Sequence, residues 1–221
     1  MTSDYINIHT HSHDPGNQFS VENVYVNAAG DLVPLKVNSQ LKSIGIHPWY
    51  MNEETVQIQL ETLERELRKG EYFALGECGI DRMKGPAIDF QEKVFAEQYR
   101  LALKYKKPMI LHVVKAYADM LHFAKNYRPK IPLIIHGFIG NTLEAEKLVK
   151  HGFHLSFGEA LLRERPKLKA AFLSCPLERA FFETDTSEVA IEQVYKKAAE
   201  LKGISLDQLI IQVKLNFERL L

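Results

Sequence analysis

The chain has 221 residues, of which 46% are hydrophobic and 25% are charged, values typical of a globular protein that argue against intrinsic disorder. Its 28 Lys and Arg residues balance 28 Asp and Glu residues, so the net charge at neutral pH is zero. A protein that coats duplex DNA with a basic face is therefore not expected, whereas a nuclease whose metal ions supply positive charge is compatible with this composition.

Short apolar runs alternate with longer amphipathic segments over most of the chain, which is the pattern of parallel βα units. One α/β barrel can take up this length without a second core. The sequence therefore predicts an α/β fold, a (β/α) barrel in a single domain over residues 1–221. The predicted strands are Tyr5–His9, Val21–Asn27, Ser43–His47, Phe73–Cys78, Met109–Val113, Leu133–Gly137, Phe153–Phe157 and Ala180–Thr184.

The N-terminal part of the chain departs from this alternation. The segment SHDPGNQFS, residues 12–20, is too short and too rich in Gly, Pro and Asn for a crossover helix, and residues 28–42 predict a turn and a hairpin. We expect a barrel trimmed near strands 1–3, which lacks its first one or two outer helices and whose second strand is antiparallel or irregular. An uncovered flank would expose apolar surface, which a homodimer could bury.

The later helices are marked by apolar residues at helical spacing. Asn52 is expected to cap the first of them, and the second is expected to end before Pro108. Two further helix starts, at Asn141 and Ser205, have the spacing of a capping box. The apolar stripes run over residues 56–67, 90–105, 191–201 and 210–220.

Metal-capable side chains follow several predicted strands, at the end where barrel enzymes build active sites. Taken singly, each has a plain structural explanation, as a core histidine or as a carboxylate that accepts hydrogen bonds from a loop. Together, four imidazoles and two carboxylates without thiolate suit a divalent ion such as Zn, Mn, Mg, Ni or Fe. Six ligands exceed those of one tetrahedral zinc, so we expect two ions per chain. The predicted ligands are His9, His11, Glu77, His112, His136 and Asp185.

Seven stretches of the sequence resemble, in the same order, the TatD family of metal-dependent hydrolases, within the amidohydrolase-like TIM barrels: INIHTH, SIGIHPW, ALGECGID, PMILH, IIHGFIG, FFETD and NFERLL. The resemblance implies a barrel, a centre of one to three metal ions and phosphodiester hydrolysis of the 3′→5′ exodeoxyribonuclease type, on DNA or RNA. By residue, it implies one ion on His9, His11 and Asp185, a second ion on His112 and His136, and Glu77 as the bridge.

The chain departs from the TatD pattern at four points. Asn7 stands where an acidic residue commonly precedes the HxH motif, and residues 113–115 replace an Arg-Asp pair that often follows the strand-five histidine. Thr186 and Ser187 follow ETD, where the family usually has one residue and then Pro, and the segment between HxH and GIHPW is short. These changes spare all six predicted ligands and fall on loops that shape substrate access, so they bear on the substrate more than on the metal chemistry.

The expected reaction is hydrolysis of a phosphodiester bond by a metal-activated water. Glu77 and Asp185 are the predicted catalytic carboxylates, with Asp185 orienting the water and accepting its proton. His47 and Lys115 are candidate substrate contacts to phosphate, although each has an equally plain alternative as a loop-bonded or solvated residue. Asp81 is expected either to orient Glu77 or a metal-bound water, or only to cap its own loop. Trp49 and Tyr50 either stack a base or pack against the next helix.

Two alternative functions stay open at this point. One is a related amidohydrolase-type enzyme that acts on a lactone, a cyclic amide or a phosphomonoester, and the other is a non-catalytic binding barrel. The opening IHTHSH is also similar to that of the PHP phosphoesterases, but GIHPW, HGFIG and ETD favour the TatD family. The expected partner is a nucleic acid end or a small phosphodiester. No membrane-spanning run and no signal-peptide pattern is found, so the sequence favours a cytoplasmic protein.

Overall fold

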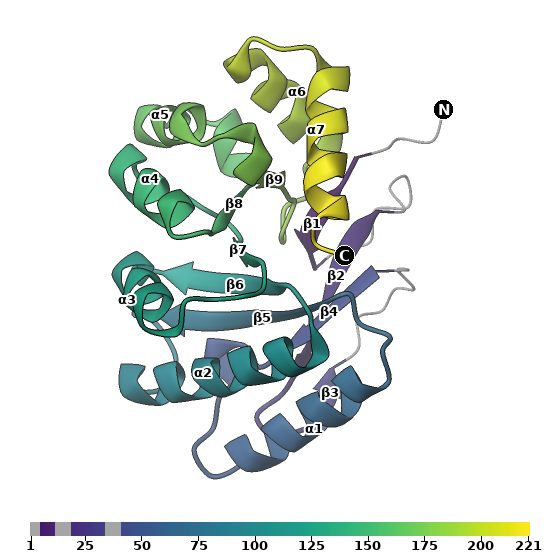
Figure 1. Ribbon diagram of the computed structural model, residues 1–221, viewed down its shortest axis with the longest axis vertical. Helices are drawn as coiled ribbons and strands as arrows, with labels where there is room; N and C mark the ends of the chain where they lie inside the picture. Colours follow the sequence, from purple (N-terminus) through teal and green to yellow (C-terminus); the bar gives the residue numbers. More distant parts are fainter. Residues whose placement is uncertain (1–4, 12–18, 34–40) are drawn as a thin grey trace.

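The structure, a computed structural model, describes residues 5–11, 19–33 and 41–221, and its sheet curls into a nearly closed barrel (Figure 1). Eight strands run parallel in the order β1-β2-β4-β5-β6-β7-β8-β9. All eight predicted strands are present, with ends shifted by a few residues. They are β1 (Asn7–Thr10), β2 (Ser20–Val26), β4 (Leu41–Gly45), β5 (Ala74–Asp81), β6 (Met109–Val114), β7 (Leu133–Ile135), β8 (His154–Phe157) and β9 (Ala180–Phe182).

Backbone hydrogen bonds join the last strand to the first and bring the two ends of the barrel together. The Asp185 amide donates to the His9 carbonyl at 3.1 Å, and the His11 amide donates to the Asp185 carbonyl at 3.0 Å. The side chain of Asn7 supports this seam, because its amide group donates to Thr184 Oγ1 at 2.8 Å and its Oδ1 accepts from the Thr184 amide at 3.2 Å. The seam therefore places the first and last predicted ligands beside one another.

The trimmed N-terminal part is confirmed for the described residues. Of the two alternatives for the second strand, the antiparallel one is wrong, and the irregular one agrees with a register shift between β1 and β2. After β2 the chain makes a turn and enters β3 (Leu32–Val33), a two-residue strand that pairs antiparallel with β2. β2 itself runs parallel to both β1 and β4. The homodimer expected to cover this flank stays a prediction.

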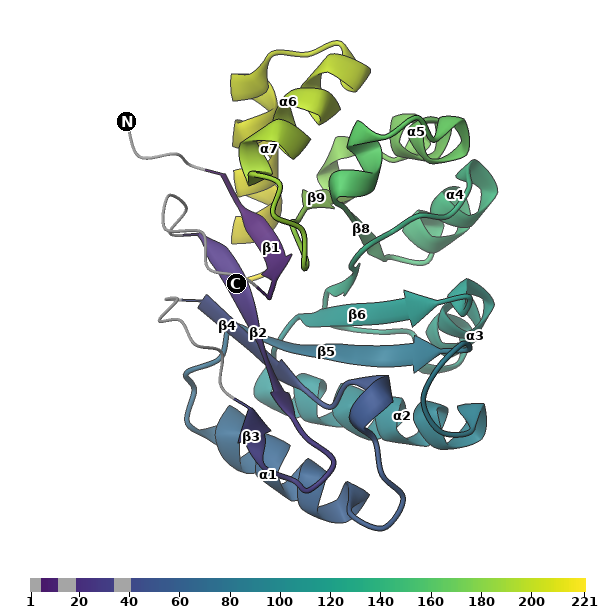
Figure 2. The same ribbon diagram turned by 180° about the vertical axis from the view of Figure 1, so that it is seen from behind.

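Helices lie outside the sheet and follow β4 to β9 in chain order (Figures 1 and 2). None of the helices in the described ranges is long and apolar enough to cross a membrane. The helices are α1 (Val56–Arg68), α2 (Ile88–Tyr105), α3 (Tyr117–Tyr127), α4 (Thr142–Lys150), α5 (Pro166–Ser174), α6 (Ile191–Lys202) and α7 (Leu206–Glu218), with 3₁₀ turns η1 (Pro48–Tyr50), η2 (Glu159–Leu162) and η3 (Leu177–Arg179).

The helix ends test the capping predictions. Both predicted capping boxes, at Asn141 and at Ser205, are present. The prediction for Asn52 is wrong, because α1 begins only at Val56 and Asn52 Oδ1 instead accepts from the Glu54 amide at 2.8 Å. Asn52 lies ahead of the N-cap residue Thr55, so its side chain closes a local turn before the helix and does not cap it.

Aromatic side chains hold the C-terminal strands of the barrel against their helices. Phe172 of α5 lies with its ring centroid 5.0 Å from that of Phe157, and Phe182 lies 4.7 Å from Tyr195 of α6. The hydroxyl of Tyr195 also donates to the Ile6 carbonyl at 2.8 Å and accepts from the Ile6 amide at 3.1 Å. Buried aromatic pairs of this kind add stability beyond their buried area, and the Tyr195 hydroxyl fixes the entry to β1.

The partly buried His154, at the start of β8, gives the fold a predicted sensitivity to acid. Burial, with the charge of nearby Arg179, lowers the pKa of His154 from 6.5 to about 4. The unfolded chain therefore takes up a proton at this residue as the pH falls from 6.5 to 4, whereas the folded chain does not. The unfolding free energy of the wild type should therefore decrease over this pH range. We expect this decrease to be about 1–3 kcal/mol smaller in His154→Gln, as measured by urea unfolding at each pH.

His122→Gln is the matched control for this measurement. His122 lies exposed on α3 and should leave the pH dependence of the unfolding free energy as it is in the wild type. If His154→Gln and the wild type lose the same free energy between neutral and acidic pH, burial of His154 does not have the effect described.

Candidate metal centre

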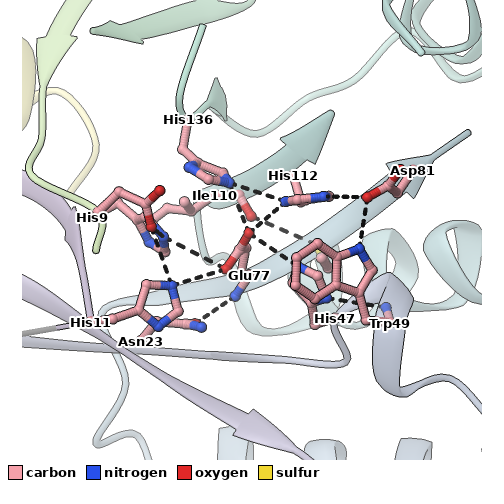
Figure 3. A network of polar contacts seen from close by, with 12 residues as sticks. His9, His11, Asn23, His47, Trp49, Glu77, Asp81, Ile110, His112 and His136 are labelled. Carbon is pink, nitrogen blue, oxygen red and sulfur yellow. Dashed lines mark hydrogen bonds and ion pairs between the residues drawn. The ribbon is translucent and has the colours of Figure 1, made fainter. Parts of the chain in front are cut away.

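Glu77 lies at the centre of a cluster of histidines at the C-terminal ends of the barrel strands (Figure 3). Its side chain is buried, and its Oε1 lies 2.7 Å from His112 Nδ1, 2.8 Å from His136 Nε2 and 3.2 Å from His47 Nε2. Burial alone would raise the pKa of Glu77, but His136 and hydrogen bonds from neighbouring histidines hold it well below its usual range. The carboxylate is therefore ionised at neutral pH.

The other oxygen of Glu77 faces the first two histidines of the chain. Glu77 Oε2 lies 3.3 Å from His11 Nε2 and 3.6 Å from His9 Nε2. The same two nitrogens lie 3.5 Å and 3.7 Å from Asp185 Oδ1, so each imidazole faces two carboxylates. The six predicted ligands are thus brought together in space, although they come from five different strand ends.

The hydrogen-bond inventory of His112 and His136 leaves room for a cation. His112 places Nδ1 against Glu77 and Nε2 at 3.1 Å from Asp81 Oδ2, so both ring nitrogens face oxygens that can only accept. His136 likewise faces Glu77 with Nε2 and Glu183 Oε1 with Nδ1, the latter at 3.5 Å. A neutral imidazole has one donor, so each ring needs either a second proton or a metal ion on the Glu77 side.

His9 supports the same conclusion from the other side of Glu77. Its side chain is fully buried, and neither ring nitrogen has a hydrogen-bond partner in the described part of the chain. Burial, with the neighbouring His136, lowers its pKa, so the ring is neutral and able to bind a metal ion. Three groups of donor atoms lie within 4.8 Å of one another: His9, His11 and Glu77; His9, His136 and Asp185; and His47, Glu77 and His112.

His47 differs from the other histidines of the cluster. Its Nδ1 accepts from the Trp49 amide at 3.1 Å, so its proton resides on Nε2, which then donates to Glu77. Burial lowers its pKa and keeps the ring neutral. His47 is thus satisfied as a neutral donor, although its position beside His112 also places it within reach of an ion. Lys115, the other candidate phosphate contact, is exposed and is not among the residues that line the cleft beside Glu77, which is described below.

Asp81 holds His112 from behind. Besides its contact with His112, Asp81 Oδ2 accepts from Trp49 Nε1 at 2.7 Å, and Oδ1 accepts from the amides of Met83 and Lys84 at 2.7 Å and 3.1 Å. The expected loop-capping role of Asp81 is therefore present, whereas the residue of the cluster that it contacts is His112 and not Glu77. A carboxylate behind a histidine fixes the ring and raises its basicity as a ligand.

Two residues that matter here are absent from the sequence-based prediction. Glu183 accepts from the Gly137 amide at 2.6 Å and faces His136, and its Oε2 is buried without a hydrogen-bond partner among the described residues. Asn23 Oδ1 accepts from the Glu77 amide at 2.7 Å and from Ser43 Oγ at 3.2 Å. The sequence carries one signal for each of them. Glu183 is a second carboxylate two positions before Asp185, and Asn23 is a polar residue inside an apolar strand.

The cluster opens into a cleft of about 420 Å³. One wall is aromatic: the rings of Tyr25 and Tyr50 stack with centroids 4.6 Å apart, and Trp49 is 41% exposed. The ammonium group of Lys84 lies 3.6 Å from the centre of the Trp49 ring. The lining residues are His11, Asn23, Tyr25, His47, Trp49, Tyr50, Glu77, His112, His136, Asp185 and Thr186.

Asn23 offers a test of how the backbone of Glu77 is held. Asn23→Ala removes the acceptor of the buried Glu77 amide, and we expect it to lower the unfolding free energy by about 1–3 kcal/mol. Ser43→Ala is the control, because it removes the second partner of Asn23 and leaves the bond to Glu77 in place. Urea unfolding checks both variants, and equal losses would show that the Glu77 amide does not depend on Asn23.

Comparisons with known proteins agree with this arrangement. A family model described as TatD related DNase matches residues 27–221. The uncharacterized metal-dependent hydrolase YjjV of Escherichia coli is 29% identical over 154 residues, which cover 67% of this chain and 59% of that protein. The deoxyribonuclease Tat-D of Schizosaccharomyces pombe is 27% identical over 156 residues, covering 65% of this chain and 50% of that protein. The chain thus spans about half to three-fifths of the length of these two relatives.

A further relative and the solved structures extend the comparison. The 3′-5′ ssDNA/RNA exonuclease TatD of Pantoea vagans is 32% identical over 145 residues, covering 64% of this chain and 55% of that protein. The crystal structure of Escherichia coli YjjV superposes with a TM-score of 0.83 at 21% identity, covering 100% of this chain and 98% of that one, and confirms the barrel fold. The resemblance predicted from the sequence is confirmed: the chain belongs to the TatD related DNase family.

Proposed function

We propose that this protein is a divalent-metal-dependent hydrolase that cleaves phosphodiester bonds in nucleic acid ends or in small phosphodiesters. The observation that carries the proposal is the buried, ionised Glu77, whose two oxygens face the nitrogens of five histidines. Relatives named as a deoxyribonuclease and as a 3′-5′ exonuclease support the choice of substrate class.

The donor set fits two ions that share Glu77. His9, His11 and Asp185 would hold one of them, and His112 and His136 would hold the other, consistent with the ring nitrogens that face carboxylates on both sides. Nitrogen and oxygen donors without thiolate suit Zn, Mn, Mg, Ni or Fe. Divalent ions at such a site acidify water and neutralise charge on phosphoryl oxygens.

Asp185 is the carboxylate best placed to handle the proton of the attacking water. Its side chain is 41% exposed, while that of Glu77 is 4% exposed, so Asp185 faces the cleft. Burial would raise its pKa, but the histidines His9, His136 and His11 lower it below the usual value. An ionised Asp185 at the rim can orient water, accept its proton and pass that proton to the leaving oxygen.

The metal content and the activity test this proposal together. We expect about two ions per chain by elemental analysis and metal-dependent hydrolysis of bis-p-nitrophenyl phosphate. His112→Ala and Asp185→Asn should each reduce the rate by more than about 100-fold, because each removes a residue of the centre. The controls are His122→Ala on α3 and Asp207→Asn on α7, which lie outside the cleft and should keep the wild-type rate.

Other outcomes of this experiment separate the alternatives. Bound metal without phosphodiester turnover would move the assignment to a hydrolase of lactones, cyclic amides or phosphomonoesters. No bound metal after repletion would leave a non-catalytic binding barrel.

The aromatic wall supports binding of a nucleobase. Trp49 presents an exposed ring beside the cluster, and stacking of a base on an aromatic ring is worth about 1–3 kcal/mol. We expect Trp49→Ala to raise KM for a short single-stranded oligonucleotide roughly tenfold. Trp49→Phe should raise KM less, because both variants lose the hydrogen bond to Asp81 and only the alanine also loses the ring. Equal KM values for the two variants would argue against stacking.

A further inference from the structure

A second cavity, of about 390 Å³, adjoins the metal cleft. Its walls are the segments that follow β7, β8 and β9, and it shares Asp185 and Thr186 with the cleft around Glu77. A molecule that reacts at the cluster can therefore extend into this cavity without leaving the surface of the protein. The segments that line it are residues 137–139, 158–160 and 183–187, together with Arg163 and Arg165.

The two arginines of this cavity differ in their partners. Arg163 is paired with Glu159, whose carboxylate oxygen lies 2.6 Å from its Nη2. The guanidinium of Arg165 is exposed and makes no hydrogen bond or ion pair with any residue in the described ranges. The other two carboxylates of the cavity, Glu183 and Asp185, face histidines of the metal centre. Arg165 is thus the cation available to a ligand.

The rest of the lining suits a phosphate. Thr186 brings a hydroxyl group to the wall that joins the two cavities, at one of the points where the chain departs from the TatD pattern. Ser187 lines the second cavity, and its hydroxyl bonds to Glu159. The planar fork of an arginine matches two oxygens of a phosphate, and hydroxyls add further donors. A nucleic acid strand carries one phosphate per nucleotide, so a strand with one phosphate at Glu77 has a second phosphate one nucleotide away.

We propose that the cavity between the β7, β8 and β9 segments is a second phosphate subsite, in which Arg165 binds the phosphate next to the one that reacts. This inference rests on the proposed function and narrows its substrate class to phosphodiesters with at least two phosphates, such as oligonucleotides. Compounds with a single phosphodiester occupy the metal cleft alone and gain nothing from Arg165.

Two thymidine oligonucleotides of different length test the subsite. The trinucleotide d(TpTpT) has two phosphates and the dinucleotide d(TpT) has one, so the ratio of their kcat/KM values reports the second phosphate. We expect Arg165→Ala to lower this ratio about tenfold, while hydrolysis of bis-p-nitrophenyl phosphate keeps its wild-type rate. Arg165→Lys should keep part of the preference for d(TpTpT), because lysine keeps the positive charge but lacks the planar guanidinium that binds two phosphate oxygens.

Two further variants sharpen this experiment. Glu159→Gln removes the partner of Arg163 and a negative charge from the wall, so it should raise the preference for d(TpTpT). Arg100→Ala, on the exposed face of α2 and outside both cavities, is the control for loss of a positive charge. Arg165→Ala should also reduce the slope of log KM against log salt for d(TpTpT) by about 0.7, the share of one phosphate contact.

The outcomes separate this inference from the proposed function. A wild-type preference for d(TpTpT) that Arg165→Ala leaves unchanged would overturn the subsite while phosphodiesterase activity stands. If the wild type hydrolyses neither oligonucleotide nor bis-p-nitrophenyl phosphate, the proposed function fails, and the two intact oligonucleotides then serve as ligands in calorimetry. In that case Arg165→Ala must still weaken d(TpTpT) binding about tenfold and leave d(TpT) binding unchanged, and equal losses for both would overturn the subsite.

Discussion

The buried charge of Glu77 is the constraint on which the rest of this site depends. An ionised carboxylate inside a barrel costs several kcal/mol unless cations or donors surround it, and a hydrophobic side chain of similar size would pack at no such cost. The surrounding strand ends supply five histidines: His9 and His11 at the end of β1, His47 after β4, His112 from β6 and His136 after β7. Burying such a cluster of charged groups is unfavourable for folding, and clusters of this kind are expected at functional sites.

The histidines around Glu77 differ in their protonation. Burial keeps His9 and His47 neutral, whereas Glu77 and Glu183 raise the pKa of His136 well above its usual value despite burial. A proton on His136 therefore compensates for Glu77. If a divalent ion is held by these nitrogens and oxygens, it would compensate for Glu77 in place of that proton, and its binding would be expected to weaken as the pH falls.

Much of the fold and of the ligand set is encoded locally, which explains why the sequence alone predicts it. Apolar runs that end in His or Glu identify a strand and its functional end together, as for His112 and Glu77. The direction of β2 depends on its pairing with β1 and β4, which local patterns do not show. Asn52 forms a local turn before α1, because its side chain bonds to the Glu54 amide and not to an amide of the helix. Asn23 and Glu183 act through partners 54 and 46 positions away, a relation that no periodicity in the chain reveals.

The site divides into a rigid part and a variable part, and the backbone explains the division. His112 lies within a paired strand, where ladder hydrogen bonds fix its backbone. The Glu77 amide is held by the side chain of Asn23, and the seam to His9 fixes Asp185. Arg165 and Thr186 lie on segments beyond the strand ends, where substitutions change shape and charge without disturbing the ladder. A barrel built this way can keep the histidines and carboxylates of the cluster while the segments after β7, β8 and β9 vary the shape and charge of the surface beside it.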